Sequence, residues 1–165
     1  MTTTANPAQI SADEKVPAIH IERIFHATPQ QLFRAHTEAD LVAQWLGPRD
    51  LEMTIDTWDC RNGGEFRYTH SRDGDAGREE YTFRGCFHDV TPTKIVQTFT
   101  FEGFPDGVSL ETMTFEDLGD GRTKLHAVSL CGSFEERDQW LASGMEEGID
   151  DGYERIDELV AAGKL

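Results

Sequence analysis

The stretch "RDQWLASGMEEGIDDGYERIDELVA", residues 137–161, is typical of a long amphipathic helix near the end of the chain. Its acidic side chains fall on one side, as on a solvent-exposed face. We expect this helix to run from about 134 to 162, and it must bury its apolar stripe against a second layer. At about 100° per residue, that stripe contains Leu141, Met145, Ile149, Tyr153, Ile156, Leu159 and Val160.

The second layer is predicted by strand-like segments that precede this helix. Their short connections, including the turn signal Asn62-Gly63, indicate mostly antiparallel pairing. Two short helices separate the first strand from the rest. One follows Thr28-Pro29 to about residue 36, and the other opens at Glu38 or Asp40 and stops after Trp45, at Gly47-Pro48. The strands are expected at 18–27, 51–60, 64–72, 78–90, 94–103, 108–118 and 122–131.

This order predicts an α+β fold in which a curved antiparallel sheet of about seven strands surrounds the C-terminal helix. We expect a single domain over residues 17–165. Residues 1–16 are small, polar and without period, and they predict a disordered tail.

Composition excludes several classes of partner and site. The formal net charge of −16 disfavours binding to nucleic acid or to an anionic membrane surface. The three cysteines, Cys60, Cys86 and Cys131, include no CxxC pair and indicate free thiols. No signal peptide or membrane-length apolar stretch is visible, so we expect a cytoplasmic protein. The histidines show no metal-ligand spacing, and we expect neither a metal nor a cofactor.

Five motifs follow one another along the chain. They are "ERIFHATPQQLFRAHTEADLVAQWLGP" (22–48), "RNGGEFRY" (61–68), "FRGCFHDVTPTKIVQTFTFEG" (83–103), "DGRTKL" (120–125) and "RDQWLASGMEEGIDDGYERIDELVA" (137–161). In this order they resemble the START-like or SRPBCC superfamily, which has the helix-grip fold, and within it they are similar to the bacterial branch of the activator of heat-shock protein 90 ATPase homologues. The resemblance implies a ligand cavity between sheet and helix, in a superfamily that includes lipid carriers and polyketide cyclases.

The residues themselves also hint at a cavity. Gly144, Gly148 and Gly152 lie four apart on the C-terminal helix. Glycine in a helix interior costs roughly 0.5–1 kcal/mol relative to alanine, so a compensating reason is expected. One interpretation is a close approach of the helix to the sheet. The other is space left for a ligand.

Strand alternation and the helix stripe together predict the walls of this cavity. Trp45 has two interpretations, a core anchor and a pocket wall. Trp58 is the least secure member, because it alternates against Met53 and Ile55. The candidate ligand-binding residues are Trp45, Trp58, Tyr68, His70, Phe83, Phe87, Phe99, Phe101, Glu111, Met113, Phe115, Met145, Ile149 and Tyr153.

Two of these candidates are polar and are therefore also considered for a catalytic role. Glu111 shares a face with Met113, and a buried carboxylate there needs a partner, for which Arg23 is the candidate. His70 shares a face with Tyr68 and could act as an acid, a base or a hydrogen-bond group. If the protein is an enzyme, His70, Glu111, Arg23 and Tyr153 are the candidate catalytic residues.

Three functions therefore compete at this point. The favoured one is binding of a small, largely apolar molecule, lipid- or polyketide-like. The second is a cyclase- or dehydratase-like enzyme that uses the same cavity. The third is a chaperone partner or stress-response module, which predicts an exposed apolar patch instead of an internal void. A homodimer could form through an edge strand, but no residue marks one.

Overall fold

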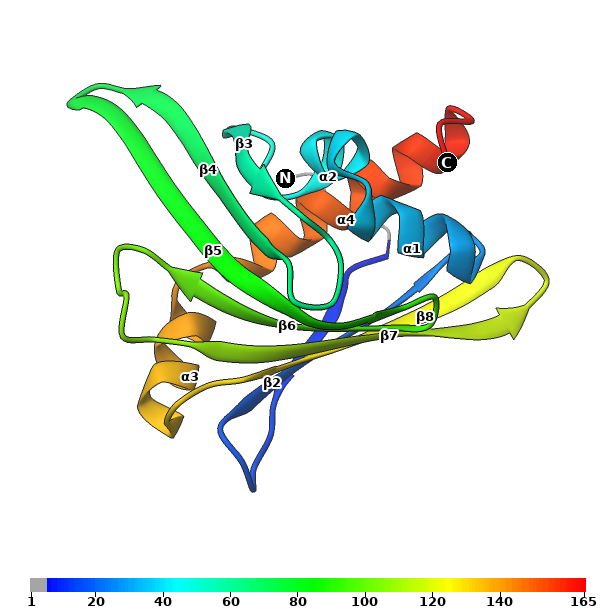
Figure 1. Cartoon of the computed structure of the whole chain (residues 1–165), viewed down its shortest axis with the longest axis horizontal. Helices are drawn as coiled ribbons and strands as arrows, with labels where there is room; N and C mark the ends of the chain where they lie inside the picture. Colours follow the sequence, from blue (N-terminus) through cyan, green and yellow to red (C-terminus); the bar gives the residue numbers. More distant parts are fainter. Residues whose placement is uncertain (1–5) are drawn as a thin grey trace.

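The computed structural model of the chain describes residues 6–165, which form one curved antiparallel sheet and four helices (Figure 1). The sheet has the spatial order β1-β2-β8-β7-β6-β5-β4-β3. Its strands are β1 (Gln9–Ala12), β2 (Ala18–Phe25), β3 (Glu52–Trp58), β4 (Glu65–Gly74), β5 (Gly77–Thr91), β6 (Lys94–Phe101), β7 (Ser109–Gly119) and β8 (Arg122–Leu130). The helices are α1 (Pro29–Thr37), α2 (Ala39–Trp45), α3 (Phe134–Ala142) and α4 (Met145–Ala161). The predicted helix-grip arrangement is confirmed, with eight strands in place of about seven.

The additional strand is β1, which lies within the segment predicted to be a disordered tail. Gln9–Ala12 pair with β2 in an antiparallel register, Gln9 opposite Glu22 and Ala12 opposite Ile19. The prediction of a tail is therefore wrong for these four residues, and residues 1–5 lie outside the described part. β1 is held by backbone pairing at a sheet edge and is largely exposed. Such a strand leaves little hydrophobic alternation in the sequence.

The two short helices begin and end where local sequence signals place them. Thr28 caps α1: its hydroxyl accepts a hydrogen bond from the backbone N–H of Gln31, and the Gln31 side chain accepts one from the Thr28 backbone. Pro29 occupies the first helical position. α2 ends at Trp45, two residues before Gly47, whose φ is +95°.

The predicted C-terminal helix is two helices. α3 ends at Ala142 and α4 starts at Met145, with Gly144 between them at φ +83°, in the left-handed region. A left-handed residue stops the helical hydrogen-bond pattern, so the expectation of one continuous helix from 134 to 162 is wrong. The break also removes Gly144 from a helix interior and explains that glycine by its backbone conformation.

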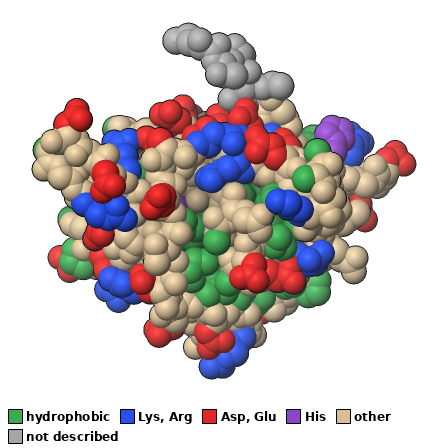
Figure 2. Space-filling view, turned by 90° about the horizontal axis from the view of Figure 1, so that it is seen from above, with side chains coloured by type: hydrophobic (Ala, Val, Ile, Leu, Met, Phe, Trp, Pro, Cys, Tyr) green, Lys and Arg blue, Asp and Glu red, His purple; other side chains and the backbone are tan. Residues whose placement is uncertain are grey.

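The helices and the sheet enclose the hydrophobic core. α4 lies within the curve of the sheet, with α1 and α2 beside it (Figure 1). Tyr153 and Ile156 of α4 join the core cluster with Phe25 of β2, whose ring meets the Tyr153 ring edge-on at 5.2 Å. Figure 2 shows acidic and basic side chains interspersed over one face, around a central area of hydrophobic side chains. No helix among residues 6–165 is long and apolar enough to cross a membrane.

A register shift in β3 decides which way Trp58 points. The pairing of β3 with β4 slips by one residue between Ile55 and Thr57. An extra residue of this kind reverses the alternation beyond it. Met53, Ile55 and Trp58 therefore all pack against the core. The prediction that Trp58 faces the inside is confirmed, and the bulge explains why simple alternation argued against it.

Candidate functional site: a cavity between the sheet and the C-terminal helices

A cavity of about 730 Å³ lies between the sheet and α4, and it also touches α2 and α3. All but two of the candidate ligand-binding residues line it. These are Trp45, Trp58, Tyr68, His70, Phe83, Phe99, Phe101, Glu111, Met113, Met145, Ile149 and Tyr153. The structure thus brings them together, while their part in binding a ligand stays a prediction.

The two exceptions are Phe87 and Phe115, which are buried in the core and do not line the cavity. Phe87 packs against Trp58 and Phe66, with ring centroids 5.6 and 5.3 Å away. Phe115 packs 5.3 Å from the ring of His36 on α1. Both point inward as predicted, but at their positions along the strands other side chains fill the interior. Their placement in the cavity wall was wrong for that reason.

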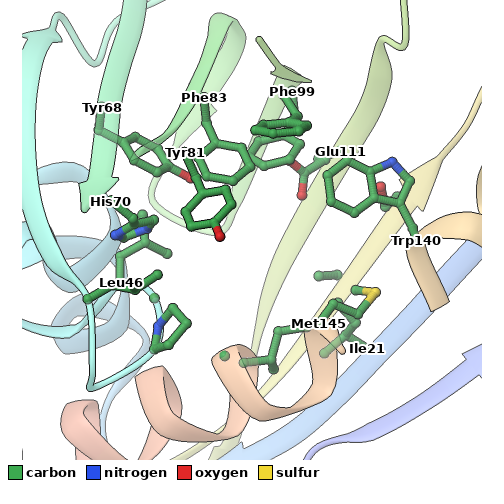
Figure 3. Close-up of a pocket in the computed structure, with 18 of the residues that line it drawn as sticks. Ile21, Leu46, Tyr68, His70, Tyr81, Phe83, Phe99, Glu111, Trp140 and Met145 are labelled. Carbon is green, nitrogen blue, oxygen red and sulfur yellow. The ribbon is translucent and has the colours of Figure 1, made fainter. Parts of the chain in front are cut away.

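Aromatic rings form one wall of the cavity (Figure 3). Phe83 stands at its centre and stacks on Phe99 at 5.3 Å with the planes 20° apart. The rings of Tyr68 and Phe101 lie 5.5 and 5.3 Å from Phe83. Trp140 of α3 extends this wall, 5.9 Å from Phe99. A wall of this kind offers broad apolar surface and π-faces to a planar molecule.

Several lining residues were absent from the sequence prediction. Some carried a usable signal, because Tyr81 alternates with Phe83, and Gln97 with Phe99. Trp140 carried none, since the break between α3 and α4 sets its position. The main residues that sequence reasoning missed are Ile19, Ile21, His36, Leu46, Tyr81, Gln97, Ser109, Ser129 and Trp140.

The mouth of the cavity is marked by those lining residues that are exposed. They come from the segment after α2, from β4 and β5, and from the α3–α4 junction. Arg72 pairs there with Asp50 and with Glu79, at 2.6 Å from the latter. The exposed lining residues are Asp50, Arg72, Tyr81, Ser143, Gly144 and Glu147. Acidic side chains therefore stand at the entrance beside a paired arginine.

Trp45 is both a core anchor and a wall of the cavity. The residue is 5% exposed, and its indole N–H donates a hydrogen bond to the Ala35 carbonyl at 2.7 Å. Its ring lies 6.3 Å from the ring of Tyr153 and also lines the cavity. The two interpretations of Trp45 hold together, because its indole is bonded to α1 while its ring also borders the cavity.

Gly148 and Gly152 of α4 have different explanations. A Cβ built on Gly152 would lie 3.0 Å from the Trp45 carbonyl oxygen, so α4 approaches α2 closely there, rather than the sheet. Gly148 borders the cavity, and a Cβ on it would only touch the Pro48 ring at 3.4 Å. Close approach therefore explains Gly152, and Gly148 stands at the edge of open space.

Glu111 is the one carboxyl group placed well inside this apolar cavity rather than at its mouth (Figure 3). It lies on β7 directly opposite Gln97 of β6. Burial raises the pKa of Glu111 to about 7, and the neighbouring Gln97 side chain opposes that rise. The group can therefore change charge near neutral pH.

His70 lies deeper than a strand-end position suggests. It is buried, its ring contacts those of Tyr68 and Phe83, and Gly47 packs against it. Burial, with the nearby charge of Arg155, lowers the pKa of His70 to about 4, so the ring is neutral at pH 7. No described residue hydrogen-bonds its Nδ1 atom.

Arg23 does not pair with Glu111, which corrects the expectation from sequence. Its guanidinium makes two hydrogen bonds to the Asp157 carboxylate on α4, at 2.7 and 3.1 Å. Arg23 also stacks over the Phe25 ring and does not line the cavity. Position along β2 explains this, because Ile19 and Ile21 take the cavity side of that strand nearer its start. Of the four candidate catalytic residues, the other three line the cavity.

The cysteines and acidic groups form no second site in the described part of the chain. Cys60, Cys86 and Cys131 are free, and burial raises the pKa of the Cys60 thiol to about 11, which disfavours a reactive thiolate. No group of three His, Cys, Asp or Glu side chains among residues 6–165 is placed to hold a metal ion.

The sequence of the chain matches a known protein family. The sequence model of the family described as activator of Hsp90 ATPase homolog 1-like protein matches residues 26–161. The chain belongs to this family. No curated protein gives a significant match to the chain.

Several solved structures share the architecture of this member of the Hsp90 ATPase activator homologue family. Protein Ms6760 from Mycobacterium smegmatis is 25% identical, with a TM-score of 0.80 over 93% of this chain and 96% of that one. A protein from Rhodobacter sphaeroides is 26% identical, with a TM-score of 0.81 over 93% and 98%. An HSP90 activator from Plasmodium falciparum is 19% identical, with a TM-score of 0.58 over 87% and 96%, which shows a shared fold alone.

Proposed function

We propose that the chain binds a small, largely apolar molecule, lipid- or polyketide-like, in the cavity between the sheet and the C-terminal helices. The observation that carries this is the cavity itself, about 730 Å³ and walled mainly by aromatic and aliphatic side chains. Binding sites for small molecules typically measure about 300–1,000 Å³ and are lined in this way, with a few polar groups. Family membership supports the proposal but does not identify the molecule.

Titration with Nile red, a neutral apolar dye, tests the proposal directly. We expect its fluorescence to rise on binding, and we expect Ile149→Trp to weaken binding because a larger side chain at this lining position narrows the cavity. Glu146→Trp is the matched control, since Glu146 is exposed on the same helix. Equal binding by both variants and the unmodified protein would count against the cavity as the site.

Native mass spectrometry of freshly purified protein addresses the identity of the molecule. A co-purified small molecule that survives in Glu146→Trp but is lost in Ile149→Trp would support the cavity as its site. An adduct retained equally by both variants would place it elsewhere on the protein.

A cyclase- or dehydratase-like activity in the same cavity is the second candidate. Glu111 favours it, because a carboxyl group with a pKa of about 7 is suited to act as a general base at neutral pH. Tyr153 and the neutral His70 also line the cavity. The activity predicts turnover of an aromatic polyketide analogue that Glu111→Gln abolishes while Nile red still binds. Equal turnover by that variant would exclude Glu111 as the base.

A chaperone-partner role is the alternative suggested by the family description. Leu110 and Leu130 favour it, because they are exposed and lie opposite each other on β7 and β8. This role predicts a faster ATPase rate of an Hsp90-type chaperone in the presence of the protein. Leu110→Ser with Leu130→Ser should remove the effect and leave Nile red binding intact.

We also place the protein in the cytoplasm, a proposal supported by its three free thiols.

A further inference from the structure

A short polar row crosses the sheet inside the apolar cavity. Glu111 on β7 lies directly opposite Gln97 on β6 and directly opposite Ser129 on β8. All three side chains line the cavity, and Glu111 lies beside the aromatic wall (Figure 3). Three adjacent strands therefore present hydrogen-bonding groups at one place in an otherwise apolar site.

The carboxyl group in this row has no cationic partner. Among residues 6–165, no lysine, arginine or histidine pairs with it, and its desolvation is offset only by Gln97. Arg72, the one arginine in the wall, lies at the mouth and is paired with Asp50 and Glu79. The titratable groups that line the cavity are His36, Asp50, Tyr68, His70, Arg72, Tyr81, Glu111, Glu147 and Tyr153.

We infer that the cavity selects an aromatic, largely apolar molecule carrying a hydrogen-bond donor, and that the Glu111 carboxyl group accepts this donor. The inference rests on the proposed function and defines its ligand class. A desolvated carboxylate without a cationic partner costs free energy, and a donor on the ligand reduces that cost on binding.

The surroundings favour a neutral or cationic donor over an anion. The chain carries a net charge of −16, and Asp50 and Glu147 stand at the mouth. An anionic ligand would approach against this field and then meet Glu111. The stacked rings of Phe83 and Phe99 favour a flat body that can lie against them.

A naphthalene series that differs in one substituent tests the inference by displacement of Nile red. The probes are 2-naphthol, a neutral donor, 2-naphthylmethylamine, a cationic donor, 2-methylnaphthalene, which has no donor, and 2-naphthoate, an anion. We expect at least one of the two donors to bind about tenfold or more tightly than 2-methylnaphthalene, as for a hydrogen bond to a charged group. We expect 2-naphthoate to bind most weakly.

Two variants locate the effect. Glu111→Met removes the acceptor at similar length and should abolish the preference for the donor, while 2-methylnaphthalene binds at least as well. Glu116→Met is the matched control, because Glu116 lies on the same strand but is exposed. It should leave the whole series unchanged.

The pH dependence separates the two kinds of donor. With the pKa of Glu111 near 7, the affinity for the amine should rise between pH 6 and pH 8, as the carboxylate forms. The affinity for 2-naphthol should change much less, because a neutral donor gains less from that charge.

The outcomes distinguish this inference from the proposed function. If Nile red binds and 2-methylnaphthalene or 2-naphthoate matches the better donor, the inference is overturned and apolar binding stands. The inference is also overturned if Glu111→Met keeps the donor preference. If neither Nile red nor any naphthalene binds, both fail. The comparison among probes on the unmodified protein needs no variant to fold.

Discussion

Replacing Gly152 by alanine should destabilise the protein, whereas the same replacement at Gly148 should stabilise it. Both glycines lie in α4, where alanine is favoured over glycine by roughly 0.5–1 kcal/mol. At Gly148 the new methyl group would meet only the Pro48 ring at 3.4 Å, an ordinary contact. The helical gain should therefore appear almost in full.

At Gly152 the same methyl group would lie 3.0 Å from the Trp45 carbonyl oxygen and 3.3 Å from its Cε3 atom. Trp45 cannot retreat easily, because it is buried and its indole is bonded to Ala35. Overpacking of this kind costs about 1–3 kcal/mol, which exceeds the helical gain. The two variants should thus differ in free energy of unfolding by about 1–3 kcal/mol.

Thermal and urea unfolding followed by circular dichroism measure this difference. For a chain of this size, about 1 kcal/mol corresponds to a Tm shift of roughly 2–4 °C. Gly148→Ala should unfold above the unmodified protein and Gly152→Ala below it. If Gly152→Ala is stabilised as much as Gly148→Ala, the close contact between α4 and α2 does not constrain the helix.

Two further predictions concern buried polar groups. Thr123→Val should lower the free energy of unfolding by about 1–3 kcal/mol, because the buried hydroxyl donates to the Ala27 carbonyl at 2.7 Å. The urea midpoints of the variant and the unmodified protein measure this loss, and equal midpoints would contradict the prediction. The pKa of Glu111 is about 7 in the folded state, above the ordinary 4.5, so the folded state binds this proton more tightly than the unfolded state. Proton binding therefore adds to the free energy of unfolding at low pH, and the addition is lost as the pH rises through 7. The pKa values of His36 and His70, lowered to about 4 by burial, act in the opposite direction between about pH 4 and 6.5. The unfolding free energy of the unmodified protein minus that of Glu111→Gln should therefore fall between pH 5 and 7.5, and a flat difference would mean that the carboxyl group titrates normally.

Much of the candidate site could be predicted because strand facing depends on local alternation. Once Phe83 faces inward, Tyr81 must do so too, and the same rule places Glu111 with Met113. The acidic face of α4 likewise fixes the orientation of Met145 and Ile149. These relations hold within one element and need no knowledge of its neighbours.

Alternation could not predict whether an inward-facing side chain borders the cavity or packs in the core. Phe87 and Phe115 point inward as alternation requires, yet they pack in the core. Whether an inward side chain meets a cavity depends on which segment lies across from it. For Phe115 that neighbour is His36, from a helix nearly eighty positions earlier in the chain.

The sequence by itself determined the order of the elements between β2 and β8, the N-terminal cap of α1, the end of α2 and the inward-facing side of the strands without a bulge, because these follow from hydrogen bonds and periodicities spanning a few residues. Only the tertiary structure decided the pairing of β1, the bulge that turns Trp58 inward and the break at Gly144. It also joined Arg23 to Asp157 and so left Glu111 without a cation. These features depend on contacts between segments that are far apart in the sequence. A local pattern does not indicate which distant side chain will pack against a given residue.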